Sequence, residues 1–208
     1  MRQGKTSLFF MERWEKWEYL EFMPVAFKEW ALVCDALGSG HQSVILRKGG
    51  IAEGKGGFGF DHDEFYLFPT WFHGQLEKVR IPNAVLPEQD PGNVTVSHVA
   101  CLEWSGRIND KEAVHRLEEF HVLDASVIEE RFEYDTPKSS LGGRGINIAF
   151  VRVYRLEPAV TLPMEPGFGG CRSWIEFPEI TRALVSVLSD EEHGRRKERF
   201  SRLLDISF

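Results

Sequence analysis

The stretch GINIAFVRVYRL, residues 145–156, is the strongest β-strand signal in this 208-residue chain. β-branched and aromatic residues dominate it, and a glycine-rich segment precedes it, which is typical of a strand entered from a turn. Shorter runs of the same kind are SVILRK (43–48), EFYLFPTW (64–71), NVTVSHVACLEW (93–104) and CRSWIEF (171–177). EWALVCDAL (29–37) is predicted to pair with SVILRK as a hairpin around GSGHQ. Strands are therefore expected to dominate the first two-thirds of the chain.

Helices are predicted between these strands and at the C-terminal end. NDKEAVHRLEEFHVL (109–123) places Asn109 and Glu112 three residues apart, the spacing of a capping box, and DASVIEERFEY (124–134) follows as a second helix. The chain is predicted to be helical from EITRALVSVL (179–188) onward, with SDEE at 189–192 starting the final helix. Because the connections resemble hairpins and short crossovers, we predict an α+β fold with a mainly antiparallel, curved sheet.

The first 24 residues are predicted to be an appendage to a single α+β domain that spans residues 25–208. Trp14, Trp17 and either Leu20 or Glu21 recur at three- and four-residue spacing, which predicts an amphipathic helix. This helix, at about residues 8–22, is expected to dock on the main body, on a protein partner or on a second copy of the chain. Its glutamates would repel anionic lipid, so a membrane role is not favoured.

Composition and charge exclude several classes of protein. Hydrophobic residues make up 42% and charged residues 27%, as in ordinary globular proteins. The net charge of −7 argues against non-specific binding of duplex DNA, although a local basic groove remains compatible with it. The sequence contains no apolar window of about 18 residues and no signal-peptide pattern. Three separated cysteines without a C-x-x-C pair suit a reducing compartment, so we expect a cytoplasmic protein.

The segment RKGGIAEGKGGFGF, residues 47–60, is dense in glycine: six of its last twelve residues are glycines. Successive glycine amides can form a nest for an anion, and the alternative is a flexible hairpin loop. No G-K-[ST] closes the segment, so it is not a Walker A loop. Arg47 and Lys48 point to opposite faces if the preceding strand extends through them, and only one of them is then expected to face a ligand.

Two further constellations suggest chemistry. Asp35 with Glu53 and Lys55 has the order of the D…E-x-K arrangement of restriction-type nucleases, in which two carboxylates hold a divalent metal ion and a lysine helps to activate water. That spacing is easily met by chance, and we assign no metal or cofactor from it. His73 is a candidate base or ligand, and Cys171 is a candidate nucleophile if a base such as His73 or His98 lies nearby.

Arg152 and Tyr154 share a face of the predicted strand at 145–156 with apolar residues. A guanidinium on an otherwise apolar face either pairs with an acid, such as Glu53 or Glu103, or lines a pocket. The sequence leaves both alternatives open.

Four ordered blocks of the chain resemble the signature of a bacterial domain-of-unknown-function family, the DUF1802 type. They are FKEWALVCDALGSGHQSVILRKGGIAE, FYLFPTWFH, RVYRL and GGCRSW, between about Phe27 and about Phe177. The resemblance implies a small prokaryotic intracellular protein and transfers no activity, because none is established for the family. One departure is Gly74, which separates His73 from Gln75. The matched residues are Lys28, Glu29, Trp30, Arg47, Lys48, Glu53, Thr70, His73, Arg152, Tyr154, Cys171, Ser173 and Trp174.

Together these patterns favour a binding module with a polar cleft for an anionic ligand, either a nucleotide or nucleic acid. One alternative is a metal-dependent hydrolase of nuclease type, with His73, Glu53 and Cys171 as the catalytic candidates. Another is an interaction subunit that docks through residues 8–22. The candidate ligand-binding residues are Arg47, Lys48, Glu53, His73, Arg152 and Tyr154.

Overall fold

The computed structural model describes residues 25–48, 58–133 and 144–208. The predicted N-terminal helix, Glu53 and most of the glycine-rich segment lie outside the described residues. Among the described helices, none combines the length and the apolar character needed to cross a bilayer.

One seven-stranded sheet organises the chain. Its strand order is β2-β5-β4-β3-β1-β6, and β7 also pairs with β5. Every neighbouring pair is antiparallel except β1 and β3, which run parallel, so the predicted mainly antiparallel sheet is confirmed. The strands are β1 (Val25–Trp30), β2 (Val44–Arg47), β3 (Glu64–Thr70), β4 (Asn93–Ile108), β5 (Ile146–Pro163), β6 (Trp174–Glu176) and β7 (Ala183–Ser186).

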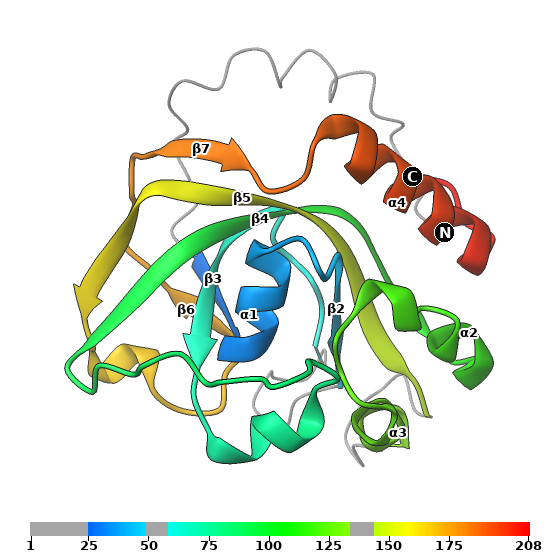
Figure 1. The fold of residues 1–208 in the computed structure, drawn as a ribbon, viewed down its shortest axis with the longest axis horizontal. Coiled ribbons are helices and arrows are strands. Elements are labelled where there is room, and N and C mark those ends of the chain that lie inside the picture. The colour runs from blue at the N-terminus through cyan, green and yellow to red at the C-terminus, as the bar shows by residue number, and fades with distance from the viewer. Residues whose placement is uncertain (1–24, 49–57, 134–143) are drawn as a thin grey trace.

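The long hairpin of β4 and β5 gives the sheet its curvature. Pairing runs from Ile108 opposite Ile146 to Asn93 opposite Pro163, and the register shifts twice along the way. Such bulges increase the local twist of a strand pair, and here β4 and β5 wrap around helix α1 (Figure 1). The strand predicted at 145–156 is confirmed, and it continues to Pro163.

Four α-helices and three short 3-10 helices complete the described part of the chain. The α-helices are α1 (Ala31–Gly38), α2 (Lys111–His115), α3 (Ala125–Glu133) and α4 (Asp190–Leu204), and the 3-10 helices are η2 (His73–Lys78), η3 (Glu118–Phe120) and η4 (Pro166–Phe168). The predicted start of the last helix is confirmed, because the Ser189 hydroxyl accepts a hydrogen bond of 3.2 Å from the Glu192 amide.

The segment predicted as the first arm of a hairpin is instead the end of β1 followed by helix α1. Of the residues Ala31–Leu37 only Asp35 is exposed, so the helix is apolar almost all round and shows no clear periodicity. Such a run cannot be told from a buried strand by pattern alone. Alanine and leucine favour the helix, and the buried Gln75 supports it, because its Oε1 atom accepts a hydrogen bond of 3.1 Å from the Leu32 amide.

Two other predictions require correction. The segment ALVS at 183–186 is strand β7 rather than helix, because it pairs with the edge of β5 from Leu156 to Tyr154 and beyond. The cap of α2 is Asp110, whose carboxylate accepts from the Glu112 amide at 3.0 Å, and not Asn109. The helix then ends at His115, earlier than the apolar stripe predicted.

Apolar side chains form two separate cores. The larger one surrounds α1 and includes Phe27, Leu37, Phe120, Phe150 and Phe200, which places α1 between the curved sheet and the other helices. The smaller one gathers Tyr66, Phe68, Val96, Phe168 and Phe177. Tyr66 and Phe65 are neighbours on β3 but belong to different cores, as alternation along a strand requires.

Candidate functional site

Charged side chains converge where the two ends of the strand order meet. Arg47, at the end of β2, donates a hydrogen bond of 3.0 Å to the hydroxyl of Ser173, the residue just before β6. Its other Nη atom lies 3.9 Å from a carboxylate oxygen of Glu29 on β1, and its guanidinium sits 5.4 Å from the ring centre of Phe27. Arg47 therefore bridges the first and last strands of the sheet.

Glu29 is the acidic centre of this convergence. It is 1% exposed, and one carboxylate oxygen accepts from the Trp30 amide at 2.8 Å. The other oxygen has no hydrogen-bond partner within the described ranges. Arg131 of α3 is also buried; its guanidinium lies over the ring of Trp30 at 4.6 Å and donates to the carbonyl of Leu46. Burial lowers the pKa of Arg131, and the nearby Glu29 carboxylate opposes that change.

Lys28 is held by a glycine turn. Its ammonium donates to the carbonyls of Phe168 and Gly170 at 2.8 and 2.7 Å. Gly170 has φ of 77°, a left-handed conformation that glycine adopts without strain. Burial lowers the pKa of Lys28; Cys171 opposes this shift, while the positive charges of Arg47 and Arg172 add to it. The backbone conformation of the GGC-x-SW block, and not only its side chains, therefore positions the Lys28 ammonium.

The convergence carries an excess of positive charge. Arg47 and Arg131 act on the Glu29 carboxylate, and Lys28 lies within electrostatic reach of Arg47 and Arg172. We call these five residues the basic corner. Arg172 is exposed and Arg47 keeps 22% of its side chain accessible, so two of the cations reach solvent. Sequence reasoning identified Arg47 directly and Lys28 and Glu29 by resemblance. It missed Arg131 and Arg172, which no local motif marks.

Of the other candidate ligand residues, the structure describes Lys48, His73, Arg152 and Tyr154. Lys48 turns to α3, where its ammonium lies 3.8 Å from a Glu130 carboxylate oxygen. His73 is exposed at the start of η2. Glu53 is outside the described residues.

Arg152 and Tyr154 contact the C-terminal segment of the chain. Arg152 pairs with Asp190 at the start of α4 and donates to the Ser186 hydroxyl at 3.2 Å. Its guanidinium lies 5.5 Å from the ring centre of Tyr154, and burial raises the pKa of that phenol. Asn147, the partner of Arg47 in the sheet, is five residues from Arg152, or about 16 Å along a strand. Arg47 and Arg152 therefore have different partners within the protein.

Cys171 is exposed in the turn that holds Lys28. The histidine proposed as its base, His98, lies against Gly38 at the end of α1: a Cβ on Gly38 would be 2.2 Å from the imidazole. Burial lowers the pKa of His98, and the charge of Arg155 adds to this shift. In the part of the chain that the structure describes, no hydrogen bond joins the Cys171 thiol to a histidine, and no three His, Cys, Asp or Glu side chains are grouped to hold a metal ion.

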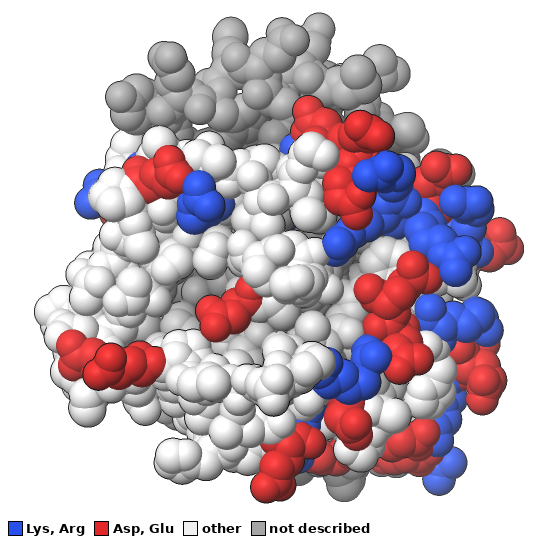
Figure 2. Space-filling model, in the orientation of Figure 1, with Lys and Arg blue, Asp and Glu red and all other residues white. Residues whose placement is uncertain are grey.

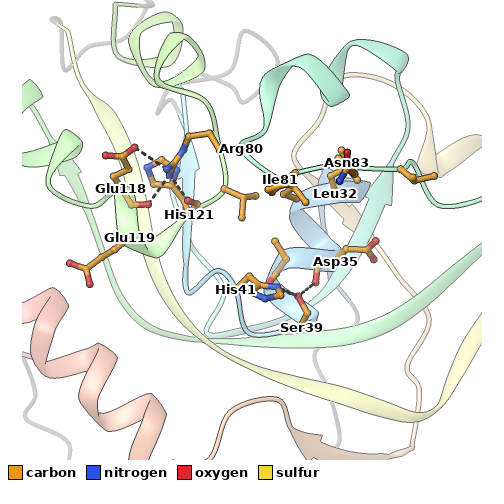
Figure 3. A pocket seen from close by; sticks show the side chains of 15 residues that line it. Leu32, Asp35, Ser39, His41, Arg80, Ile81, Asn83, Glu118, Glu119 and His121 are labelled. Carbon is orange, nitrogen blue, oxygen red and sulfur yellow. Dashed lines mark hydrogen bonds and ion pairs between the residues drawn. The ribbon is translucent and has the colours of Figure 1, made fainter.

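A cavity of about 660 Å³ opens beside α1, and we call it the α1 cavity (Figure 3). Its walls come from α1, from the segment 80–85 and from residues 118–122. Figure 3 shows Arg80, Glu118 and His121 on one side and Asp35 on the other. Of its lining residues, sequence analysis singled out only Asp35, as a possible metal ligand, because the three segments share no motif and are distant along the chain.

Most exposed charges on the face shown in Figure 2 lie outside the α1 cavity. Figure 2 shows basic and acidic side chains crowded together over α4 and over helices α2 and α3, while the rest of this face carries few charges. On α4 these charges pair with one another, as Arg195 with Glu192 at 2.5 Å and Arg196 with Glu192 at 3.1 Å. The intermixed signs are typical of a solvated helix face rather than of a single-sign binding surface.

Comparisons with solved structures find weak likenesses. The crystal structure of ASCH from Zymomonas mobilis is 14% identical, covers 83% of this chain and 92% of that chain, and has a TM-score of 0.42. A crystal structure of a mutant of the same protein is 13% identical, covers 86% of this chain and 97% of that chain, and has a TM-score of 0.44. At these values the likeness assigns no function. No curated protein matches the chain.

The basic corner and the strands that build it fall within one family model. That model is described as "Domain of unknown function (DUF1802)" and matches residues 26–199, most of the chain. The protein therefore belongs to the DUF1802 family.

Proposed function

We propose that the protein is a binding module and that the basic corner holds an anionic ligand, a nucleotide or a segment of nucleic acid. The observation that carries this proposal is the charge balance among the described residues: Lys28, Arg47, Arg131 and Arg172 are linked electrostatically, and the one acid within the basic corner is Glu29. Buried cations are normally matched by acids, and a local excess favours a bound anion. An anion beside Arg47 and Arg172 would supply the missing negative charge.

The chemistry of the corner suits phosphate. A guanidinium presents its donors in a planar fork that matches two phosphate oxygens, and Arg47 and Arg172 are the accessible ones. Lys28 and Arg131 add positive charge to the basic corner, and some of their donors bind backbone carbonyls. The protein's net charge of −7 makes such recognition local rather than dependent on the whole surface.

The other predicted ligand residues remain predictions. Lys48 and Glu53 follow Arg47 by one and six residues along the chain, and we keep them in the proposed site. His73, Arg152 and Tyr154 are kept as sites to substitute, with the expectation that their effects on anion binding are smaller than that of Arg172.

The test is the binding of a fluorescently labelled single-stranded 12-nucleotide RNA, measured by anisotropy at several salt concentrations. Arg172→Ala is expected to weaken binding about five- to tenfold and to reduce the salt slope by about 0.7, the value for one phosphate contact with single strands. The matched control is Arg202→Ala, an arginine on α4 whose side chain is 65% exposed. Competition by adenosine monophosphate at millimolar concentration would favour a nucleotide site.

Two results would refute the proposal. One is equal weakening by Arg172→Ala and Arg202→Ala, which would mean that any surface arginine contributes. The other is the absence of binding by both RNA and nucleotide at low salt. Arg47→Ala is informative only beside an unfolding measurement, because Arg47 also balances the buried Glu29.

A further inference from the structure

One face of helix α1 lines the α1 cavity. Leu32, Asp35, Ala36 and Ser39 lie at spacings of three and four residues, which places them on one side of a helix. Val33, Cys34 and Leu37 belong instead to the larger core. The cavity side of the helix therefore combines Leu32 and Ala36, each 3% exposed, with the polar residues Asp35 and Ser39.

The opposite wall is braced by Arg80, which leaves no free cation there. The Arg80 guanidinium donates to the carbonyls of Glu118, His121 and Leu123 at 2.8 to 2.9 Å. It also pairs with the Glu118 carboxylate at 2.8 Å. These contacts use the donors of Arg80 to hold residues 118–123 in place. An incoming anion would have to compete with all of them.

Asp35 is the acidic group of the cavity that lacks a counter-ion. Glu118 pairs with Arg80, and Glu119 pairs with Arg199 at 3.0 Å. Asp35 forms no ion pair within the described ranges, and partial burial of its carboxyl raises its pKa, although the residue as a whole is exposed. The remaining charge in the cavity is therefore negative, and it sits beside apolar side chains.

The buried His121 contributes a neutral ring. Its Nδ1 accepts a hydrogen bond of 3.1 Å from the Leu123 amide, so the proton of the neutral imidazole lies on Nε2. Burial lowers the pKa of His121 to about 3, and the charges of Arg80 and Arg131 contribute to this shift. At neutral pH the ring therefore adds no positive charge to the cavity.

We propose that the α1 cavity binds a protonated organic amine of nucleoside size, with its ammonium on Asp35 and its apolar body against Leu32, Ala36 and Ile81. The volume of about 660 Å³ lies in the range of small-molecule sites. This site is distinct in residues and in charge from the basic corner. A test that refutes anion binding at the basic corner would therefore leave this proposal unaffected, and the reverse also holds.

Three indoles of nearly equal shape test the proposal by calorimetry with the full chain: tryptamine is cationic, tryptophol is neutral and indole-3-acetate is anionic. Tryptamine is expected to bind about tenfold more tightly than tryptophol, as for one charge-assisted hydrogen bond at a partly desolvated carboxylate. Indole-3-acetate is expected to bind weakest. Asp35→Asn should remove the advantage of tryptamine over tryptophol and leave tryptophol unchanged.

The control variant is Asp205→Asn, an exposed aspartate after α4 whose φ of 52° asparagine also tolerates. It should bind all three indoles as the wild type does. Ile81→Trp fills the cavity from its loop wall and should abolish all binding, while its unfolding curve shows whether the fold is intact. The proposal is overturned if no indole binds, if indole-3-acetate binds as tightly as tryptamine, or if Asp35→Asn and Asp205→Asn have equal effects.

Discussion

The basic corner and the α1 cavity use charge in opposite ways. In the basic corner, Glu29 and Arg131 are buried, and each is hydrogen-bonded to the backbone of a strand. Glu29 also pairs with Arg47, so these charges hold strands β1 and β2 and helix α3 together. In the α1 cavity, Asp35 lies at the edge of open space and pairs with no cation among the described residues. The difference shows that a charged residue near a site is informative about ligands only after its structural partners are accounted for.

The largest expected difference between the two regions is in stability. Glu29→Gln leaves Arg47 and Arg131 near one another without their shared carboxylate, and removing one partner of a buried ion cluster costs about 3 kcal/mol. Asp35→Asn should change the free energy of unfolding by less than about 0.5 kcal/mol, as for a surface substitution. Urea unfolding of both variants measures the contrast.

Phosphate sharpens this measurement. If the basic corner binds anions, 50 mM phosphate should stabilise Glu29→Gln more than Asp35→Asn at equal ionic strength, because the ligand replaces a lost negative charge. Equal unfolding free energies for the two variants would contradict the distinction between a structural and an available carboxylate.

The two regions also differ in why each needs a glycine. A Cβ on Gly38, the last residue of the helix that lines the cavity, would meet the His98 imidazole of β4 at 2.2 Å, whereas a Cβ on Gly170, in the turn that holds Lys28, would meet nothing within 4 Å. Gly38→Ala should therefore cost about 2 kcal/mol through overpacking. Gly170→Ala should cost about 1 kcal/mol through its left-handed φ alone.

Asparagine separates these two causes, since it tolerates a left-handed backbone but is larger than alanine. Gly170→Asn is expected to unfold at a higher urea concentration than Gly170→Ala, while Gly38→Asn should unfold at a lower one than Gly38→Ala. The same order at both positions would show that one mechanism acts in both.

The sequence predicted the sheet better than it predicted the two sites. β5 could be identified because β-branched residues and a preceding turn are local signals, and Ser189 because capping is local. Helix α1 could not, since it is buried against the core on one side and faces the cavity on the other, which removes the periodicity that marks a helix.

The composition of the sites depends on tertiary contacts. Arg47 was identified from its neighbouring glycines, but its partners come from β1, α3 and the segment before β6. Nothing within the sequence around Arg131 indicates that it lies near Glu29. The α1 cavity is assembled from three segments that are each ordinary when taken alone. A list of polar residues therefore identified part of the basic corner and, in the α1 cavity, only Asp35, which it assigned to a different role.

The smallest expected effect concerns pH, and it again separates the two regions. The pKa of His121 is lowered to about 3 in the folded chain, whereas an unfolded histidine titrates near about 6.5. The unfolded chain therefore takes up a proton that the folded chain does not, and stability falls as the pH falls below about 6.5. Between pH 6 and pH 5 this linkage should cost about 1 kcal/mol.

His121→Asn isolates this contribution, because the asparagine oxygen can accept the Leu123 amide in place of Nδ1 without titrating. Its free energy of unfolding should fall by about 1 kcal/mol less than that of the wild type between pH 6 and pH 5. Lys28→Met in the basic corner should not alter the wild-type slope, because the lowered pKa of an ammonium affects stability only at alkaline pH, where its folded and unfolded forms differ in protonation. An identical pH slope for the wild type and His121→Asn would mean that His121 is hydrated in the folded chain, and the wall of the cavity would then be open to water.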